Sequence, residues 1–316
     1  MAVTAARTPR RGAQKFTSKR KKSVLRRMRE EWSAYAMQSP GLLLFAVFVL
    51  FSISFSIYIS FHRWDILNPA KPYVGLENYR TLAHDDTFKK SLYNTFIYTL
   101  FSVPLTMVGG LLIALLLNQS IRGRGLFRTI FFIPVITPIV IAALIWKWVY
   151  DYDYGLANYY LEKLHIIGQP QLWLANPDLA LPAVIAMTVW KGMGFAMVIY
   201  LAGLQSIPEE YYEAAKVDGA GPLHRLRYIT IPLLAPTSFF LLVIGIIGAF
   251  QVFTEIYIMT GGGPLSSTST IVWYLWTMGF RNFQMGYATA IAYALFAIIF
   301  VFTCIQVRFL YRESEY

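Results

Sequence analysis

One polar stretch of the sequence combines acidic residues, alanines and glycines in a pattern that suits a binding surface for another protein. It runs from Ser206 to Pro232, reads SIPEEYYEAAKVDGAGPLHRLRYITIP, and lies between two long apolar segments. We call residues 206–232 the cassette. Its first acidic residues, Glu209 and Glu210, would lie near the positive end of a helix dipole, where negative charge is favourable. A solvated loop with no partner is the alternative on composition alone.

The cassette carries start and stop signals for two short helices. Ser206 followed by Glu209 fits a capping box, and Pro208 falls in the first turn, where its missing N–H is harmless. Gly219 is expected to end this helix, either in a left-handed conformation or at close range to a partner surface where a side chain would clash, because glycine lacks a Cβ. A second short helix is predicted to begin at the Gly-Pro pair and to run to residue 232.

Residues for catalysis, metal binding or nucleotide binding are missing from the rest of the sequence. The four histidines are dispersed, and none is spaced with Cys or carboxylates as a metal site requires. Neither a phosphate-binding loop nor a serine-hydrolase motif occurs, and the glycines at 261–263 precede Pro264 rather than a lysine. The single cysteine, Cys304, excludes a disulfide framework. We therefore expect no enzymatic activity, no cofactor and no metal.

The elements that must position the cassette are membrane-spanning helices. Only 14% of the 316 residues are charged, against roughly 25% in soluble domains. Long runs lack charge altogether or hold a single lysine, at 41–61, 91–121, 129–146, 179–208, 228–254 and 282–307. A span needs about 20 apolar residues. The sequence therefore predicts an all-α polytopic membrane protein with six transmembrane helices.

The distribution of basic residues predicts the orientation of these helices. Nineteen of the 28 Lys and Arg residues lie in the two termini, in 118–128 and in the cassette, whereas eight lie in the alternate loops. The positive-inside rule then puts both termini and the cassette in the cytoplasm. The basic N-terminal tail is interpreted as a topology determinant rather than a nucleic-acid-binding arm.

The segments outside and within the spans can be divided further. Residues 1–39 are predicted to be a basic tail with a possible amphipathic helix at 23–38, and residues 311–316 a cytoplasmic C-terminus. The six-helix transmembrane domain between them covers 40–310 and includes the cassette. The run 91–121 would be longer than a bilayer core, and Pro104 with Gly109 and Gly110 suggests a kink or a break within it.

One charge, Lys191, lies in the middle of a predicted span. A charge at mid-membrane costs about 2.5–3.5 kcal/mol on insertion scales, so Lys191 should face the bundle interior or a wet cavity. Two roles are open from the sequence. Lys191 either lines a solute path, or it bonds helix carbonyls or extends its amine to the interface in a structural role.

The spacing within the cassette resembles the EAA loop of permease subunits in ATP-driven, binding-protein-dependent importers. The matching pattern is Glu-Ala-Ala, three residues, Gly, nine residues, Ile, one residue, Ile-Pro, with Ile231 where Leu is usual. In that family the loop forms a coupling helix that docks in the ATPase subunit. The resemblance implies a type I ABC importer fold and these coupling residues: Glu213, Ala214, Ala215, Asp218, Gly219, Ile229 and Pro232.

The resemblance extends over about residues 40–310 and is closest to the carbohydrate branch, in particular to the subunit related to the larger maltose-importer permease. The segments VGLENY, GLFRTIFFIP, WKGMGFAMVIYLAGLQ and IYIMTGGGP match it. It implies a second permease subunit, an ATPase dimer that binds the ATP, an extracytoplasmic sugar-binding protein, and a location in the plasma membrane of a bacterium or archaeon. It further implies that a sugar, polyol or related solute passes Lys191, Gly192, Phe195, Gly245, Gly248, Ala249, Gln251 and Val252. The glycines replace bulkier residues of the maltose importer. This should open space there, and it puts maltose itself in doubt.

Two other classes were weighed against an importer permease. A secondary transporter is disfavoured because five of the six spans lack the carboxylates that ion-coupled carriers use, and because no internal repeat is present. A membrane-embedded enzyme is disfavoured by the missing catalytic residues. The sequence does not specify which solute is carried.

Overall fold

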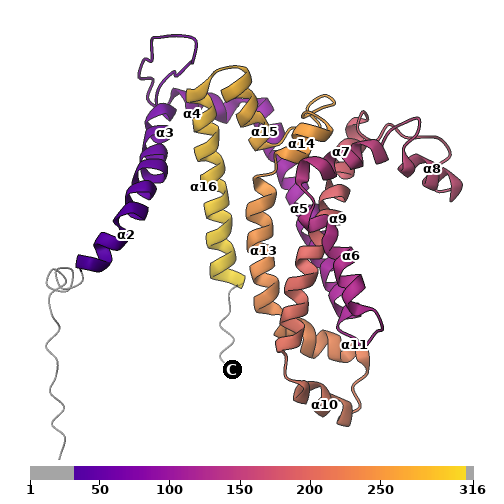
Figure 1. Ribbon diagram of the computed structural model, residues 1–316. Helices are drawn as coiled ribbons and strands as arrows, with labels where there is room; N and C mark the ends of the chain where they lie inside the picture. Colours follow the sequence, from indigo (N-terminus) through magenta and orange to yellow (C-terminus); the bar gives the residue numbers. More distant parts are fainter. Residues whose placement is uncertain (1–31, 311–316) are drawn as a thin grey trace, which may run out of the picture. The chain divides into compact units, whose positions relative to one another are not determined.

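The computed structural model describes residues 32–310, and helices make up its architecture (Figure 1). Within these residues strand-like pairing amounts to two isolated bridges, His62 with Tyr73 and Asp65 with Gln284. The prediction of an all-α protein is confirmed. The chain divides into two compact units, one ending at Phe55 and the other beginning at Ser56.

The described part of the first unit is a single apolar helical segment. Helix α2 (Trp32–Phe45), the π-helical turn η1 (Ala46–Phe51) and α3 (Ser52–Ser60) follow one another without a break, and α3 continues into the second unit. The 29 residues are long and apolar enough to span a membrane. The helix already includes Trp32, which is eight residues before the predicted boundary at 40. The other predicted tail residues, 1–31, and the C-terminal 311–316 lie outside the described residues.

The second unit contains the remaining helices. In chain order they are α4 (Glu77–His84), α5 (Asp86–Leu117), α6 (Arg124–Ile136), α7 (Ile139–Val149), α8 (Leu156–Lys163), α9 (Pro177–Ser206), α10 (Glu209–Val217), α11 (Pro222–Arg225), η2 (Leu226–Thr230), α12 (Ile231–Leu233), α13 (Ala235–Phe250), α14 (Thr254–Met259), α15 (Ile271–Trp276), η3 (Thr277–Arg281) and α16 (Met285–Leu310).

The six predicted spans differ in shape. Four are single helices, namely 32–60, α5, α9 and α16 up to Arg308, whereas two are bent pairs. Helices α6 and α7 meet at 99°, and the segment Pro222–Leu233 meets α13 at 63°. The described chain therefore has four unbroken spans, or up to six if each bent pair is one span. Charge-free length locates a span, but it does not show whether the span is straight.

The predicted break in the second span is absent. Helix α5 is continuous over 32 residues and includes Pro104. Its glycines have a packing role instead, because a Cβ at Gly110 would lie 2.5 Å from the Cβ of Ala196 and 2.9 Å from the backbone N of Met197. Glycine here permits α5 and α9 to approach closely. The sequence pattern was correct in marking these positions, but the interpretation as a break was wrong.

The core of the second unit surrounds α9. One apolar cluster at the middle of the bundle joins Tyr98, Val184 and Met187, and another joins Ala114, Met197 and Leu204. Helix α6 also contacts α9 at close range, because a Cβ at Gly194 would lie only 2.1 Å from the carbonyl oxygen of Phe131. Helix α9 is thus fixed between α5 and α6 by positions without side chains.

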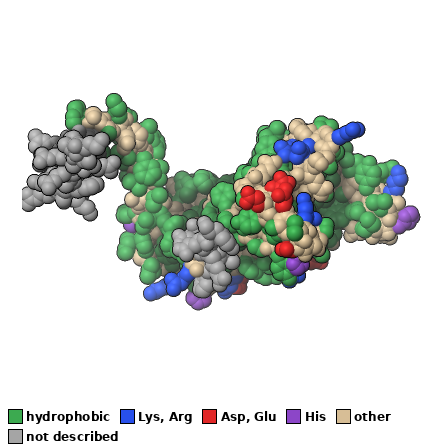
Figure 2. Space-filling view, turned by 90° about the horizontal axis from the view of Figure 1, so that it is seen from below, with side chains coloured by type: hydrophobic (Ala, Val, Ile, Leu, Met, Phe, Trp, Pro, Cys, Tyr) green, Lys and Arg blue, Asp and Glu red, His purple; other side chains and the backbone are tan. Residues whose placement is uncertain are grey.

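The second unit has two distinct ends. Helices α10 and α11 lie at the lower end in Figure 1, whereas α4, α14 and α15 lie at the upper end. Helix α16 ends on the same side as the cassette. Viewed from below, charged side chains gather over the cassette while the flanks are mainly hydrophobic (Figure 2). This division suits a bundle whose flanks face lipid and whose ends face water.

Candidate functional site: a membrane cavity and an exposed cassette

The second unit contains a cavity of about 330 Å³ between α5, α9 and α13. Each helix contributes residues at helical spacing, so that one face of each lines the space. The lining residues are Tyr98, Ser102, Val103, Thr106 and Met107 of α5, Thr188, Gly192, Phe195 and Ala196 of α9, Leu241, Ile244, Gly245, Gly248 and Ala249 of α13, and Val252 and Glu255 beyond it.

Six of the eight residues predicted for the solute path line this cavity, and two do not. Gly192, Phe195, Gly245, Gly248, Ala249 and Val252 are among its walls, although they come from two segments about 50 residues apart. Gln251 is exposed outside the lining, and Lys191 is directed elsewhere. The resemblance thus identifies a set of residues that the fold brings together.

Of the residues expected to open space, namely Gly245, Gly248 and Ala249, Gly245 does not do so. A Cβ at Gly245 would lie 2.9 Å from Val103, and one at Gly192 would lie 2.9 Å from Thr106. These two glycines allow close contact with α5. Gly248 differs, because a Cβ there would meet nothing within 4 Å. Gly248 alone of the three leaves room in the cavity.

The Lys191 side chain lies at the bend between α6 and α7. Its ammonium donates to the carbonyl oxygens of Pro134 at 2.9 Å, Val135 at 3.2 Å and Thr137 at 2.7 Å. The bend frees these acceptors, since Pro138 has no N–H to donate to the carbonyl of Pro134 four residues earlier. Of the two roles left open by the sequence, the structure supports the structural one.

Sequence reasoning missed Glu255, which lines the cavity from the first turn of α14. Burial raises the pKa of the Glu255 carboxyl, whereas the charge of Lys191 acts to lower it, and the two side chains form no ion pair within 4 Å. The signal was its place one residue after the charge-free run 228–254. Because Glu255 stands outside that run, the sequence places it in the following loop.

Some polar side chains around the cavity have hydrogen-bond partners, and others do not. The Tyr98 hydroxyl donates to Thr188 Oγ1 at 2.9 Å, and Thr188 in turn donates to the Val184 carbonyl at 3.1 Å. Ser102 is 3% exposed, and its Oγ has no hydrogen-bond partner in the described structure. A buried hydroxyl without a partner is unfavourable by about 1–3 kcal/mol.

The cassette forms the two predicted helical segments, α10 and then α11 to α12. The predicted capping box is wrong, because Ser206 belongs to the end of α9 and donates to the Gly203 carbonyl at 2.8 Å. Pro208 takes the N-cap position of α10, and no side chain caps this end. Helix α9 extends far enough to use Ser206 for its own last turn.

Gly219 has the left-handed conformation that the sequence predicted, with φ of +78°. The Ala220 N–H donates to the Ala215 carbonyl at 2.8 Å, and the Gly219 N–H donates to the Lys216 carbonyl at 3.1 Å. This pair of bonds is a Schellman motif, which satisfies the last carbonyls of α10. A Cβ at Gly219 would meet nothing within 4 Å. Backbone conformation rather than crowding requires glycine.

The predicted coupling residues surround or flank a surface cleft of about 460 Å³. Its lining includes Ala215, Asp218, Gly219 and Ile229. Glu213 and Ala214 are exposed on α10, and Pro232 is exposed on α12. The Tyr212 hydroxyl and Thr230 Oγ1 are 3.0 Å apart and hold α10 against η2. The cassette is therefore an ordered surface with its motif residues open to solvent.

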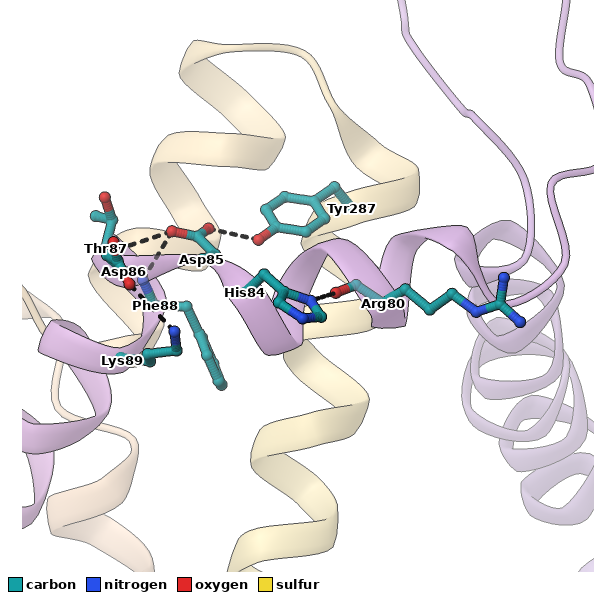
Figure 3. A network of polar contacts seen from close by, with 8 residues as sticks. All are labelled: Arg80, His84, Asp85, Asp86, Thr87, Phe88, Lys89 and Tyr287. Atoms are coloured by element: carbon teal, nitrogen blue, oxygen red, sulfur yellow. Dashed lines mark hydrogen bonds and ion pairs between the residues drawn. The ribbon is translucent and has the colours of Figure 1, made fainter.

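A polar cluster at the opposite end of the unit was not predicted (Figure 3). Asp85 Oδ1 accepts from the backbone N–H groups of Thr87 at 2.8 Å and Phe88 at 3.1 Å and so caps α5. Its Oδ2 accepts from the hydroxyls of Tyr274 and Tyr287, each at 2.5 Å. The carboxylate thereby joins the start of α5 to α15 and α16. An Asp directly before a helical run was the available signal.

The hydrogen bonds at Asp85 also set its ionisation. Burial acts to raise the pKa of the Asp85 carboxyl, but the bonds from Tyr274, Tyr287 and the two backbone N–H groups together lower the pKa below its usual value. Because these donors stabilise the ionised form, the cluster is intact when Asp85 is charged.

Residues 32–310 contain no group of three His, Cys, Asp or Glu placed to hold a metal ion.

Comparison with known proteins identifies relatives along nearly the whole chain. The family model "Binding-protein-dependent transport system inner membrane component" matches residues 87–312. The trehalose/maltose transport system permease protein MalF of Thermococcus litoralis is 37% identical over 281 residues, covering 89% of this chain and 94% of that protein. The probable ABC transporter permease protein YurN of Bacillus subtilis is 34% identical over 275 residues, covering 86% and 94%.

A solved structure shares the fold. A chain of the bacterial alginate ABC transporter in complex with alginate pentasaccharide-bound periplasmic protein matches with a TM-score of 0.80 at 24% identity, covering 92% of this chain and 98% of that one. The sn-glycerol-3-phosphate transport system permease protein UgpA of Yersinia pestis is 32% identical over 286 residues, covering 90% of this chain and 96% of that protein.

Proposed function

We propose the following role for this chain, which belongs to the family of binding-protein-dependent transport system inner membrane components: it passes a sugar or a related polyhydroxylated solute through the membrane for an ATP-driven importer. The chain is a multi-pass transporter permease subunit. The importer would contain a second permease, an ATPase dimer that binds and hydrolyses ATP, and an extracytoplasmic binding protein. The chain itself would need no cofactor.

The observation that carries the proposal is the exposed, ordered cassette. Helix α10 ends in a Schellman motif beside an open cleft, so its shape is fixed without any contact from the bundle at Gly219. A rigid surface outside the membrane suits docking to a soluble subunit, since little ordering is needed on binding. We assign to this surface the ATPase-coupling role of Glu213, Ala214, Ala215, Asp218, Gly219, Ile229 and Pro232.

Support for a sugar as the solute comes from the cavity and from the relatives. The cavity is mostly apolar with a few hydroxyls, as expected for a site that binds the apolar faces and the hydroxyls of a sugar. The Thermococcus relative is a trehalose/maltose permease by name. We therefore propose a solute path past Gly192, Phe195, Gly245, Gly248, Ala249 and Val252, with Lys191 shaping its wall from behind.

Co-purification tests this role. The chain, purified from its native host, should retain an ATPase and a second permease in detergent, and proteoliposomes of that complex with its binding protein should take up a radiolabelled neutral sugar, with trehalose as the first probe, on addition of ATP. Glu213→Ala should reduce ATPase retention roughly tenfold or more, because a charge-assisted hydrogen bond is lost. Glu210→Ala removes the same charge from the same helix outside the motif and should have little effect. A wild-type chain that retains no ATPase would contradict the proposal.

We further propose that the cassette and both termini are cytoplasmic. The loop charges support this, as does the end of α16 on the cassette side of the unit (Figure 1). In a Cys304→Ser background, His224→Cys should be protected from an impermeant thiol reagent applied to intact cells, whereas His165→Cys should react. Both histidines are exposed, so the reverse labelling would invert the orientation.

A further inference from the structure

We propose that Glu255 gives the cavity a negative potential that selects neutral polyhydroxylated solutes and excludes anionic ones. The inference rests on the proposed function, because it assumes that solute enters this cavity. Glu255 was not among the residues expected on the solute path. Its role follows from its place in the wall.

Glu255 is the only formally charged side chain among the described residues that line the cavity. It is only partly exposed, and most of the surrounding lining is apolar, from Val103 and Met107 to Leu241 and Ile244. A charge beside apolar walls is poorly screened, so its field extends across a space of this size. A second negative charge entering the cavity would be repelled.

Lys191 does not cancel this field by pairing with Glu255. The three carbonyl bonds of Lys191 hold its ammonium at the α6–α7 bend, and Lys191 is not part of the lining. The two charges attract each other, but they form no ion pair. An anionic solute would therefore approach the carboxylate of Glu255 without a cation in the lining to receive it.

A neutral sugar meets a charged acceptor that its hydroxyls can satisfy. The Glu255 carboxylate accepts hydrogen bonds, and sugar hydroxyls donate them. The hydroxyls of Tyr98 and Thr188 already bond each other, and the Ser102 Oγ is enclosed by protein atoms. The capacity of the lining to bind a hydroxylated solute thus lies mainly with Glu255. It is not suited to a phosphate or sulfonate, such as the glycerol phosphate named for UgpA.

Charged thiol reagents measure this field directly. Gly248→Cys in a Cys304→Ser background places a thiol in the cavity, where a Cβ meets nothing within 4 Å. Ile244→Cys gives a second reporter one turn earlier in the lining. The full-length chain, purified with its partner permease at low salt, is treated with trimethylammonium-ethyl or sulfonate-ethyl methanethiosulfonate. Each rate is divided by the rate for a free thiol.

The cationic reagent should react roughly tenfold faster than the anionic one after this correction, as expected for a weakly screened charge several ångströms away. Glu255→Gln should bring the ratio close to one. Glu210→Gln removes a charge from the cassette and should leave the ratio unchanged. An unchanged ratio in Glu255→Gln, or an unreactive thiol at both positions, would overturn the inference.

Uptake separates this inference from the proposed function. If the complete wild-type importer takes up trehalose or maltose but Glu255→Gln leaves the labelling ratio unchanged, the inference alone is wrong. If the wild-type importer takes up neither sugar nor sugar-related solute, the proposed function is wrong. In an importer that works, Glu255→Gln should lower neutral-sugar uptake at least severalfold, since a carboxylate acceptor is lost.

Discussion

The cavity and the cassette use glycine for opposite purposes. Around the cavity, Gly192 and Gly245 remove side chains so that helices can pack, whereas Gly219 in the cassette provides a left-handed backbone in open space. The first kind of position tolerates no added volume. The second tolerates volume but not an altered backbone. Substitutions in the bundle should therefore affect folding, and those in the cassette should affect docking.

The largest expected effect is at Gly194, where α9 contacts α6. Gly194→Leu would place a Cβ 2.1 Å from the Phe131 carbonyl oxygen, so the helices must separate. We expect destabilisation of about 3 kcal/mol, at the upper end for overpacking. Little monodisperse protein should be recovered by size-exclusion chromatography. Gly248→Ala adds a Cβ in open space and should elute normally. Equal recovery of the two variants would show that close packing of α9 on α6 does not require glycine at position 194.

Next in size is Lys191→Met, which removes three hydrogen bonds at the α6–α7 bend. Carbonyls left unpaired in the bundle should lower stability by about 2 kcal/mol. A thermal-shift assay in detergent should show a lower Tm, while the retained ATPase per folded chain is unchanged. Lys147→Met changes the same residue type at an exposed position of α7 and serves as the control. An unaltered Tm for Lys191→Met would leave the lysine without a structural role.

A smaller effect is expected at Asp85, which joins α5 to α15 and α16 at the end opposite the cassette. Asp85→Ala should lower stability by about 1 kcal/mol, as loss of an N-cap does. Because the folded pKa is lowered, the contribution of Asp85 is fully present above the unfolded value of about 3.9 and is lost as the pH falls through the folded value.

Unfolding in detergent between pH 7 and pH 3 tests this assignment. The stability difference between wild type and Asp85→Ala should shrink below about pH 4. Asp86→Ala is the matched control, since Asp86 is exposed and contacts Lys89 at 3.1 Å. A difference that stays constant down to pH 3 would show that the charge of Asp85 does not stabilise the cluster.

The smallest effect on stability, with a large effect on docking, is expected for Gly219→Val. A β-branched residue at φ of +78° is unfavourable by about 1–2 kcal/mol, so the end of α10 should change shape. The bundle should keep its Tm within the error of the assay, while ATPase retention should fall at least tenfold. Gly221→Ala, at φ of −69°, should retain the ATPase. Full retention by Gly219→Val would refute the docking role of the cassette.

Features that depend on local sequence were predictable. Charge-free runs located the spans, and glycine followed by a Gly-Pro pair located both helical segments of the cassette and the left-handed residue between them. Each of these follows from chain stiffness, hydrophobicity or backbone freedom within a few residues. The order of residues alone is sufficient for such features.

Features that depend on contacts between distant segments were not predictable. Gly110 suggests a kink or a break rather than a packing position because Ala196, its actual neighbour, is 86 residues away in the sequence. The capping role of Ser206 was misassigned because its neighbours in the sequence do not show that α9 continues through Ser206. The path residues of α9 and α13 could be grouped only through a family resemblance, and Glu255 had no such guide.

The hydrogen bonds of Lys191 also bear on how the chain is made. Its carbonyl partners lie 54 to 57 residues earlier, so they are synthesised well before the lysine. At about 5–20 residues per second, roughly 3–11 s separate the two. During that interval the bend between α6 and α7 must wait in the insertion machinery or at the bilayer surface with its carbonyls hydrated. Helix α9 then brings the ammonium and the acceptors into the membrane together. Insertion of the α6–α7 bend is therefore completed only when α9 inserts.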